Sequence, residues 1–157
     1  MSLTAFRLVK AKHAANAFSG DGARIAGGRW NLPGTSVVYA SDSLSLAALE
    51  TFVHLQPVDR RVRYTWFHIT IPDSVTVETP DTLPNDWRAE PPSETTQSLG
   101  TQWAEQNRTA VLRVPSILVP GEFNLLLNPS HARFKRIKIS GPRPFDFDGR
   151  LWKSGEK

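Results

Sequence analysis

Apolar residues recur along this chain mostly in short runs with a period of two, which predicts more strands than helices. The longest such run extends from Arg61 to Ile71, where positions of one parity change from basic to apolar side chains. This change is expected of a sheet strand whose surroundings differ along its length. The pattern predicts strands at 4–9, 36–41, 61–71, 75–78, 109–115 and 136–140.

Two helices are predicted, at 43–56 and 95–107, and the first has Asp42 or Ser43 as its N-cap. Residues 79–94 contain four prolines, so they predict an irregular connection. Such a connection is most often a surface crossover, and the alternative is a lid over a site.

The composition is that of an ordinary globular domain, with 39% hydrophobic and 22% charged residues among 157. A chain of this length can bury roughly two-thirds of its unfolded surface. The expected organisation is one α+β domain over residues 1–153, with mainly antiparallel sheets and a few helices, followed by a polar, flexible tail at 154–157.

Neither a membrane span nor a metal site is predicted. Lys10 and Lys12 follow only a short apolar run, and no stretch approaches 18 consecutive apolar residues, so a cytoplasmic location is expected. The chain has no cysteine, and its four histidines lack close metal-ligand spacing.

The net charge is +4, and a basic run lies between Arg133 and Lys138. Four uses are open: a guarded edge strand, a surface for an acidic protein partner, a field that attracts an anionic ligand, or nucleic-acid binding. Because the run alternates poorly with aromatic residues, a structural or protein-binding use is favoured over nucleic-acid binding.

A candidate ligand site begins with a glycine pair. Two glycines let the backbone approach a ligand, a guanidinium suits phosphate, and two aromatic rings offer flat faces for a ring. In order, these residues are Gly27, Gly28, Arg29, Trp30 and Tyr39. The combination indicates a site for an anionic ligand that contains a ring.

Glu50 is the only formally charged side chain between Asp42 and Asp59. Both faces of its helix are mostly apolar, which predicts a buried helix. An unpaired carboxylate there would cost several kcal/mol or take up a proton, so a partner is required, and Arg29 is the obvious candidate. The pair could be a structural tie or part of a binding site.

Ten short blocks occur in the order found in the RES domain, which the chain resembles over nearly its full length. The blocks are Phe6-Arg7, 20–24, 28–31, 38–41, 48–50, Gly100 with Trp103, 114–116, Asn124, Asn128-Pro129 with His131, and Phe147-Asp148 with Arg150. The domain is named for an arginine, a glutamate and a serine. It occurs in bacterial toxins that pair with Xre-type helix-turn-helix antitoxins. One departure is Leu32, where the family often has proline.

The resemblance implies an ADP-ribosyltransferase-like fold and an enzyme that consumes NAD as its substrate. The reaction would be hydrolysis or phosphorolysis of the nicotinamide–ribose bond, or ADP-ribose transfer to a protein. Cleaving that bond builds positive charge on the ribose carbon, which Glu50 could stabilise. By the same resemblance, Arg29 would hold pyrophosphate or ribose, Ser116 would hydrogen-bond nicotinamide or ribose, and Tyr39 would stack on nicotinamide.

Residues 27–31 are called the glycine segment below, and further NAD contacts are expected from its Gly28, Trp30 and Asn31. Arg7 and Arg24 are candidate phosphate contacts, with solvated surface arginines as the alternative. His131 could support the site or form a turn. A cognate Xre-type antitoxin is expected to cover the mouth of the cleft, with no direct nucleic-acid binding by this chain. A non-catalytic nucleic-acid-binding or regulatory module is the remaining alternative.

Overall fold

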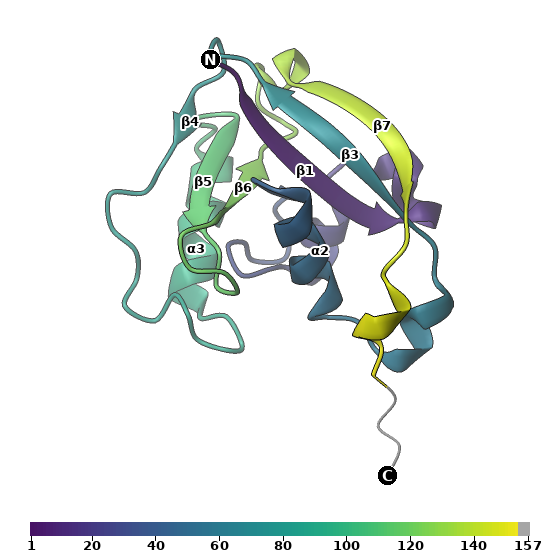
Figure 1. The fold of residues 1–157 in the computed structure, drawn as a ribbon. Helices are drawn as coiled ribbons and strands as arrows, with labels where there is room; N and C mark the ends of the chain where they lie inside the picture. The colour runs from purple at the N-terminus through teal and green to yellow at the C-terminus, as the bar shows by residue number, and fades with distance from the viewer. Residues whose placement is uncertain (154–157) are drawn as a thin grey trace.

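The computed structural model describes residues 1–153, which form one seven-stranded sheet with helices packed against it (Figure 1). The strand order is β4-β5-β6-β2-β1-β3-β7, and every neighbouring pair is antiparallel except β4 and β5. The strands are β1 (Leu3–Lys10), β2 (Val38–Ser41), β3 (Tyr64–Ile71), β4 (Val77–Glu78), β5 (Val111–Pro115), β6 (Phe123–Leu127) and β7 (Lys138–Phe145). The predicted α+β class is confirmed, and the predicted tail at 154–157 lies outside the described residues.

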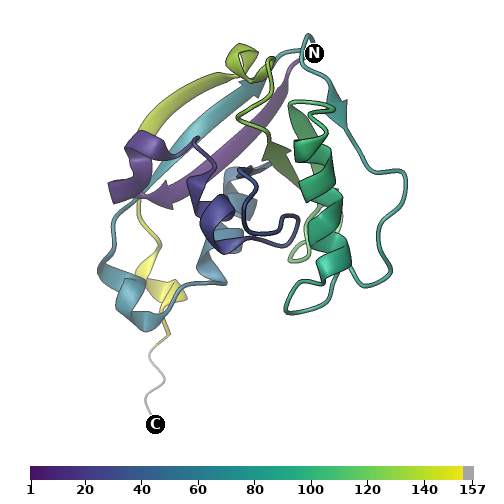
Figure 2. The ribbon, with the colours of Figure 1, turned by 180° about the vertical axis from the view of Figure 1, so that it is seen from behind.

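Three α-helices accompany the sheet: α1 (Asp21–Ala26), α2 (Leu44–Phe52) and α3 (Glu94–Glu105). Short 3-10 helices occur at Ala11–Asn16, Pro57–Arg61, Phe134–Arg136 and Gly149–Leu151. Figure 2 shows α3 lying across β5 and β6, whereas Figure 1 shows α2 below β1. Among residues 1–153, no helix has both the length and the apolarity to cross a membrane.

Alternation along the strands builds an apolar core on each face of the sheet. One face carries a continuous cluster that includes Ala5, Ile69 and Leu125. On the other face, Trp103 of α3 packs over β5 and β6, and Ala47 of α2 packs over β1 and β3. Because β2 lies between β6 and β1, the two helices flank the middle of this face.

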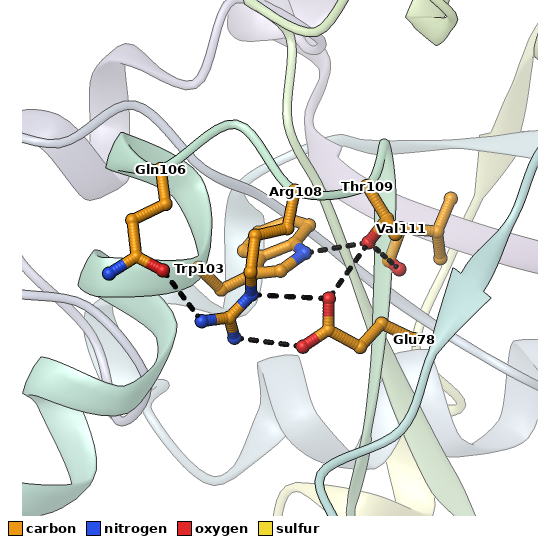
Figure 3. A network of polar contacts seen from close by, with 6 residues as sticks. All are labelled: Glu78, Trp103, Gln106, Arg108, Thr109 and Val111. Carbon is orange, nitrogen blue, oxygen red and sulfur yellow. Dashed lines mark hydrogen bonds and ion pairs between the residues drawn. The ribbon is translucent and has the colours of Figure 1, made fainter.

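A polar network fastens α3 to the sheet at its carboxyl end (Figure 3). The indole Nε1 of Trp103 donates to Thr109 Oγ1 at 2.8 Å, and that hydroxyl donates to the carbonyl of Val111 at 2.9 Å. Beside it, Arg108 Nη2 lies 2.8 Å from a carboxylate oxygen of Glu78 in β4. The network joins α3, β4 and β5, and so fixes the height of the helix above the sheet.

All six predicted strands and both predicted helices are present with shifted ends. The strand predicted at 61–71 begins at Tyr64, because Pro57–Arg61 forms a 3-10 helix and the carboxylate of Asp59 accepts from the Gln56 N–H at 2.8 Å. The predicted N-cap is confirmed at Ser43, whose side chain accepts from the N–H of Leu46.

The sequence pattern missed β6 and α1. β6 is a run of apolar residues interrupted by one asparagine, without alternation, and only the turn residues on either side mark it. α1 has six residues, too few for a helical period to be visible.

The basic run ends in a strand at the edge of the sheet. β7 is the last strand in the order, and Lys138, Pro142 and Pro144 lie on it. Lysine and proline on an exposed edge discourage pairing with another chain. This arrangement agrees with the guarded-edge interpretation of the run.

Candidate functional site

The carboxylate of Glu50 is held by two side chains from the opposite half of the sheet. Ser116, just after β5, donates its hydroxyl to Glu50 Oε1 at 2.9 Å, and Asn124 of β6 donates its amide to the same oxygen at 2.8 Å. Both bonds link residues more than 60 positions apart, so the cluster exists only in the folded sheet.

The orientation of the Ser116 hydroxyl is fixed by its own turn. Its oxygen accepts from the backbone N–H groups of Leu118 and Val119 at 3.1 and 3.2 Å. With both lone pairs engaged, the single hydroxyl proton is directed to Glu50. Ser116 is 4% exposed, which keeps water from competing for this bond.

The second oxygen of Glu50, Oε2, differs from the first. Within residues 1–153 it accepts no hydrogen bond, and it is not a fully buried atom. No Lys, Arg or His of the described chain forms an ion pair with Glu50. Within the described residues the carboxylate therefore has no ion-pair partner, and one of its oxygens has no hydrogen-bond donor.

The prediction that Glu50 pairs with Arg29 is wrong. Arg29 instead bonds the connection before α3: Nη1 donates to the carbonyls of Trp87 and Ala89 at 3.1 and 2.8 Å, and Nη2 pairs with the carboxylate of Glu90. The predicted burial of the whole helix is also wrong, because Leu49 and Val53 of the outer face are 47% and 55% exposed. Glu50 therefore lies on a half-buried helix and takes neutral hydrogen-bond donors in place of a cation.

Tyr39 holds the glycine segment in place. Its hydroxyl donates to Asn31 Oδ1 at 2.6 Å and accepts from the Trp30 N–H at 3.1 Å. A Cβ on Gly28 would lie 2.6 Å from the same hydroxyl, so only glycine fits there. Burial raises the pKa of the Tyr39 phenol well above its usual value, although the Trp30 hydrogen bond and the Arg29 charge oppose the rise, so the hydroxyl stays neutral and can donate.

Trp30 and Asn31 are buried anchors of this segment. The Asn31 amide donates to the carbonyl of Ala23 at 2.9 Å, and Trp30 stacks on Trp87 with ring centroids 6.0 Å apart. The proline-broken connection therefore packs directly on the loop that carries Arg29.

The second-rank candidates lie apart from the Glu50 cluster. Arg7 is half-buried and donates to the carbonyls of Ala17 and Tyr39, and desolvation lowers its pKa to about 10. These bonds tie β1 to its neighbours, and a phosphate contact of Arg7 stays a prediction. Arg24 is exposed and pairs with Asp21 on α1. His131 lies in a turn after the far end of β6, where its Nδ1 accepts from the Arg133 N–H, which confirms the turn alternative.

Sequence reasoning assigned no role to Asn124 or Ser41. Ser41 of β2 lies opposite Asn124 of β6, and its hydroxyl donates to Asn124 Oδ1 at 2.8 Å. The available signal was a polar residue inside each of two apolar strand segments, which is unusual unless the residue has a buried partner.

Two cavities of the described chain lie away from these residues. One, of about 350 Å³, lies between α2 and the aromatic residues after β7, and the other, of about 560 Å³, lies beside α3. Neither is lined by Glu50 or Arg29. Within residues 1–153, no group of three His, Asp or Glu side chains is arranged to hold a metal ion. The candidate site therefore rests on its hydrogen-bond geometry.

Comparison with known proteins identifies relatives across nearly the whole chain. The RES domain family profile matches residues 4–148. The "Prs ADP-ribosylating toxin" of Sphingobium sp. (strain YBL2) is 45% identical over 141 residues, which cover 87% of this chain and 88% of the relative. "Toxin Res" of Yersinia enterocolitica is 42% identical over 148 residues, covering 93% and 97%.

The fold also has a solved counterpart. A chain in the crystal structure of the M. tuberculosis MbcT–MbcA toxin–antitoxin complex superposes with a TM-score of 0.75 at 22% sequence identity, covering 93% of this chain and 85% of that one. Together with the profile match and the close relatives, the sheet and its carboxylate cluster lead to one assignment: the chain belongs to the RES domain family of toxins.

Proposed function

We propose that this protein is the toxin of a toxin–antitoxin pair and acts by cleaving the nicotinamide–ribose bond of NAD, with Glu50 as the central catalytic group. The observation that carries the proposal is the state of the Glu50 carboxylate. Its Oε1 is fixed by two neutral donors, whereas Oε2 accepts no hydrogen bond and no cation among residues 1–153 forms an ion pair with it.

This arrangement suits the charge that develops in the reaction. As neutral nicotinamide leaves, positive charge grows on the ribose carbon and ring oxygen, and a fixed negative charge nearby lowers the barrier. Ser116 and Asn124 prevent the carboxylate from rotating without cancelling its charge. An Arg29–Glu50 ion pair would have weakened this effect, so its absence supports the proposal.

Arg29 is proposed to bind the pyrophosphate of NAD. Its guanidinium is only 13% exposed and already holds one carboxylate, that of Glu90, so the position is suited to an anion. Tyr39 would keep the glycine segment rigid through Trp30 and Asn31. Stacking of the Tyr39 ring on nicotinamide stays a prediction.

Arg29→Lys is expected to weaken NAD binding by at least about tenfold, since an ammonium cannot reproduce the planar fork of a guanidinium on phosphate. Titration calorimetry with NAD in a Glu50→Gln background measures the affinity without turnover. Arg136→Lys, in the basic run, makes the same chemical change away from the site and is the control. Equal NAD affinity for Arg29→Lys and the parent would remove Arg29 from the binding site.

Glu90→Gln is expected to lower the KM for NAD, because the Glu90 carboxylate competes with phosphate for Arg29. Glu90 is 73% exposed, and an exposed ion pair contributes up to about 1 kcal/mol, so the decrease should be at most about fivefold. Steady-state kinetics measure it, with Asp86→Asn in the same connection as control. A rise in KM would mean instead that Glu90 holds Arg29 in its binding position.

One experiment tests the proposal directly and separates the reaction types. The purified protein is incubated with NAD, with and without phosphate, and nicotinamide and the ADP-ribose products are resolved by chromatography. Free ADP-ribose indicates hydrolysis, and a phosphorylated ADP-ribose that requires added phosphate indicates phosphorolysis. No release of nicotinamide under any condition, including addition of cell extract, would refute the proposal.

ADP-ribose transfer to a protein is the second candidate. It is favoured by the name of the Sphingobium relative, an ADP-ribosylating toxin that is 45% identical to this chain. Both candidates break the same bond first, so the Glu50 cluster serves either. Labelled NAD distinguishes them, because transfer leaves ADP-ribose attached to a protein band in cell extract.

A cognate antitoxin is proposed as the partner, and the cytoplasm as the place where both meet NAD. The similarity to a toxin solved in a toxin–antitoxin complex supports an antitoxin, and the Xre type rests on the family resemblance. No direct nucleic-acid binding is proposed, and the position of Lys138 on the edge strand β7 supports a structural use of the end of the basic run.

A further inference from the structure

We propose that Ser41 is a positioning residue for the reaction: its hydroxyl holds the side-chain amide of Asn124 in the orientation that donates to Glu50. The inference deepens the proposed function and rests on it. Within the described residues Ser41 makes no hydrogen bond to Glu50 and is buried, so its proposed effect on the carboxylate passes through Asn124.

The geometry forms a chain of two hydrogen bonds across three elements. Ser41 Oγ donates to Asn124 Oδ1 at 2.8 Å, and Asn124 Nδ2 donates to Glu50 Oε1 at 2.8 Å. Both polar atoms of the amide are thereby used, one by β2 and one by α2. Ser41 is 3% exposed, so no bulk water can replace its hydroxyl.

The register of the sheet brings the side chains of Ser41 and Asn124 together. Ser41 and Asn124 are direct partners in the antiparallel β2–β6 ladder, which places their side chains on the same face. Two further hydrogen bonds join the strands at the next pair of residues. The Asp42 carboxylate accepts from the Phe123 N–H at 3.1 Å, and the Asp42 N–H donates to the Phe123 carbonyl. The backbone of Asn124 is therefore held by the sheet. Only its side-chain torsion angles can still change, and the hydrogen bond from Ser41 restricts them.

Loss of the hydroxyl of the buried Ser41 would leave Asn124 Oδ1 without its protein donor. The amide would then rotate toward any other donor and lose its bond to Glu50, or keep that bond at a lower occupancy. Ser116 alone would hold the carboxylate, which could pivot about that single bond. The consequence concerns the reacting geometry more than the affinity for NAD, since the phosphate end of the ligand is proposed to bind at Arg29.

The test is a kinetic comparison of Ser41→Ala and Ser41→Thr. Ser41→Ala should lower kcat by about fivefold to tenfold, the effect of losing one neutral hydrogen bond, and change the KM for NAD by less than about twofold. Ser41→Thr keeps the hydroxyl and suits a strand, so kcat should return to near the parent value. Unchanged kcat in Ser41→Ala would overturn the inference.

Thr65→Val is the matched structural control. Thr65 is a buried hydroxyl on β3 that donates to the Arg143 carbonyl at 2.8 Å, away from Glu50. It should lower the melting temperature without lowering kcat per folded molecule. If Ser41→Ala and Thr65→Val lose activity only in proportion to their unfolded fraction, Ser41 is merely structural and the inference fails.

A second variant applies if Ser41→Ala does not fold. Ser41→Cys has a weaker donor of similar size, so its kcat should be below that of Ser41→Thr. Equal kcat values for the two variants would overturn the inference.

Glu50→Gln, assayed in parallel, separates this inference from the proposed function. Full turnover by Glu50→Gln would overturn both. Loss of turnover in Glu50→Gln, together with a parent rate in Ser41→Ala, would overturn the role of Ser41 and leave the proposed function intact.

Discussion

Glu50→Gln is expected to reduce nicotinamide release from NAD by at least about a hundredfold, the scale of removing one main electrostatic stabiliser. In this structure the substitution changes the charge of the side chain while preserving its hydrogen bonds. The glutamine carbonyl can occupy the Oε1 position and keep the bonds from Ser116 and Asn124, so only the charge and the open Oε2 are lost. The melting temperature should stay close to that of the parent protein.

Chromatographic measurement of nicotinamide, together with thermal melting, checks both parts of this prediction. Glu94→Gln removes an equal charge from α3 and should keep the parent rate. A folded Glu50→Gln protein that releases nicotinamide at the parent rate would end the assignment of Glu50 as the catalytic carboxylate.

Gly100→Ala is expected to give the largest loss of stability, at least about 3 kcal/mol in the free energy of unfolding. A Cβ at this buried position of α3 would lie 1.9 Å from the carbonyl oxygen of Trp30, so backbone must move. α3 cannot rise easily, because the Trp103 and Arg108 contacts fasten its end to the sheet. Displacement of Trp30 would also move the neighbouring Arg29.

Gly22→Ala provides the control, because a Cβ on Gly22 in α1 meets nothing within 4 Å. Alanine favours a helix over glycine, so this variant should be as stable as the parent or more stable by up to about 1 kcal/mol. Denaturant unfolding of both variants measures the difference. Similar stability of Gly100→Ala and the parent would mean that α3 lies farther from the glycine segment.

The sequence predicted what depends on local pattern and missed what depends on distant partners. Alternation located β1 and β3, and the cap at Ser43 located the start of α2. The Arg29–Glu50 pair was wrong because the choice of partner depends on which segment covers the arginine. That segment carries Glu90, 61 positions away, and proline spacing gives no indication of where such a connection packs.

The cluster around Glu50 was predictable only in part. The apolar pattern of its helix singled out Glu50 and the family resemblance added Ser116, and the structure brings the two side chains to 2.9 Å. Asn124 lies on β6, a strand that the pattern did not reveal, so its contact with Glu50 could not be anticipated. The role of Ser41 could not be predicted for the same reason, because its contact with Asn124 depends on the pairing of β2 with β6.

The separation in sequence between Glu50 and its hydrogen-bond partners determines how late in synthesis the Glu50 cluster can assemble. Glu50 precedes Asn124 by 74 positions, and β6 must insert between β5 and β2 before the carboxylate is held. At about 5–20 residues per second, a ribosome that has synthesised Glu50 needs roughly 4–15 s more to reach Asn124. The nascent chain therefore passes most of its synthesis without an assembled site. The proposed antitoxin, if already present, would have this time to bind before the proposed activity begins.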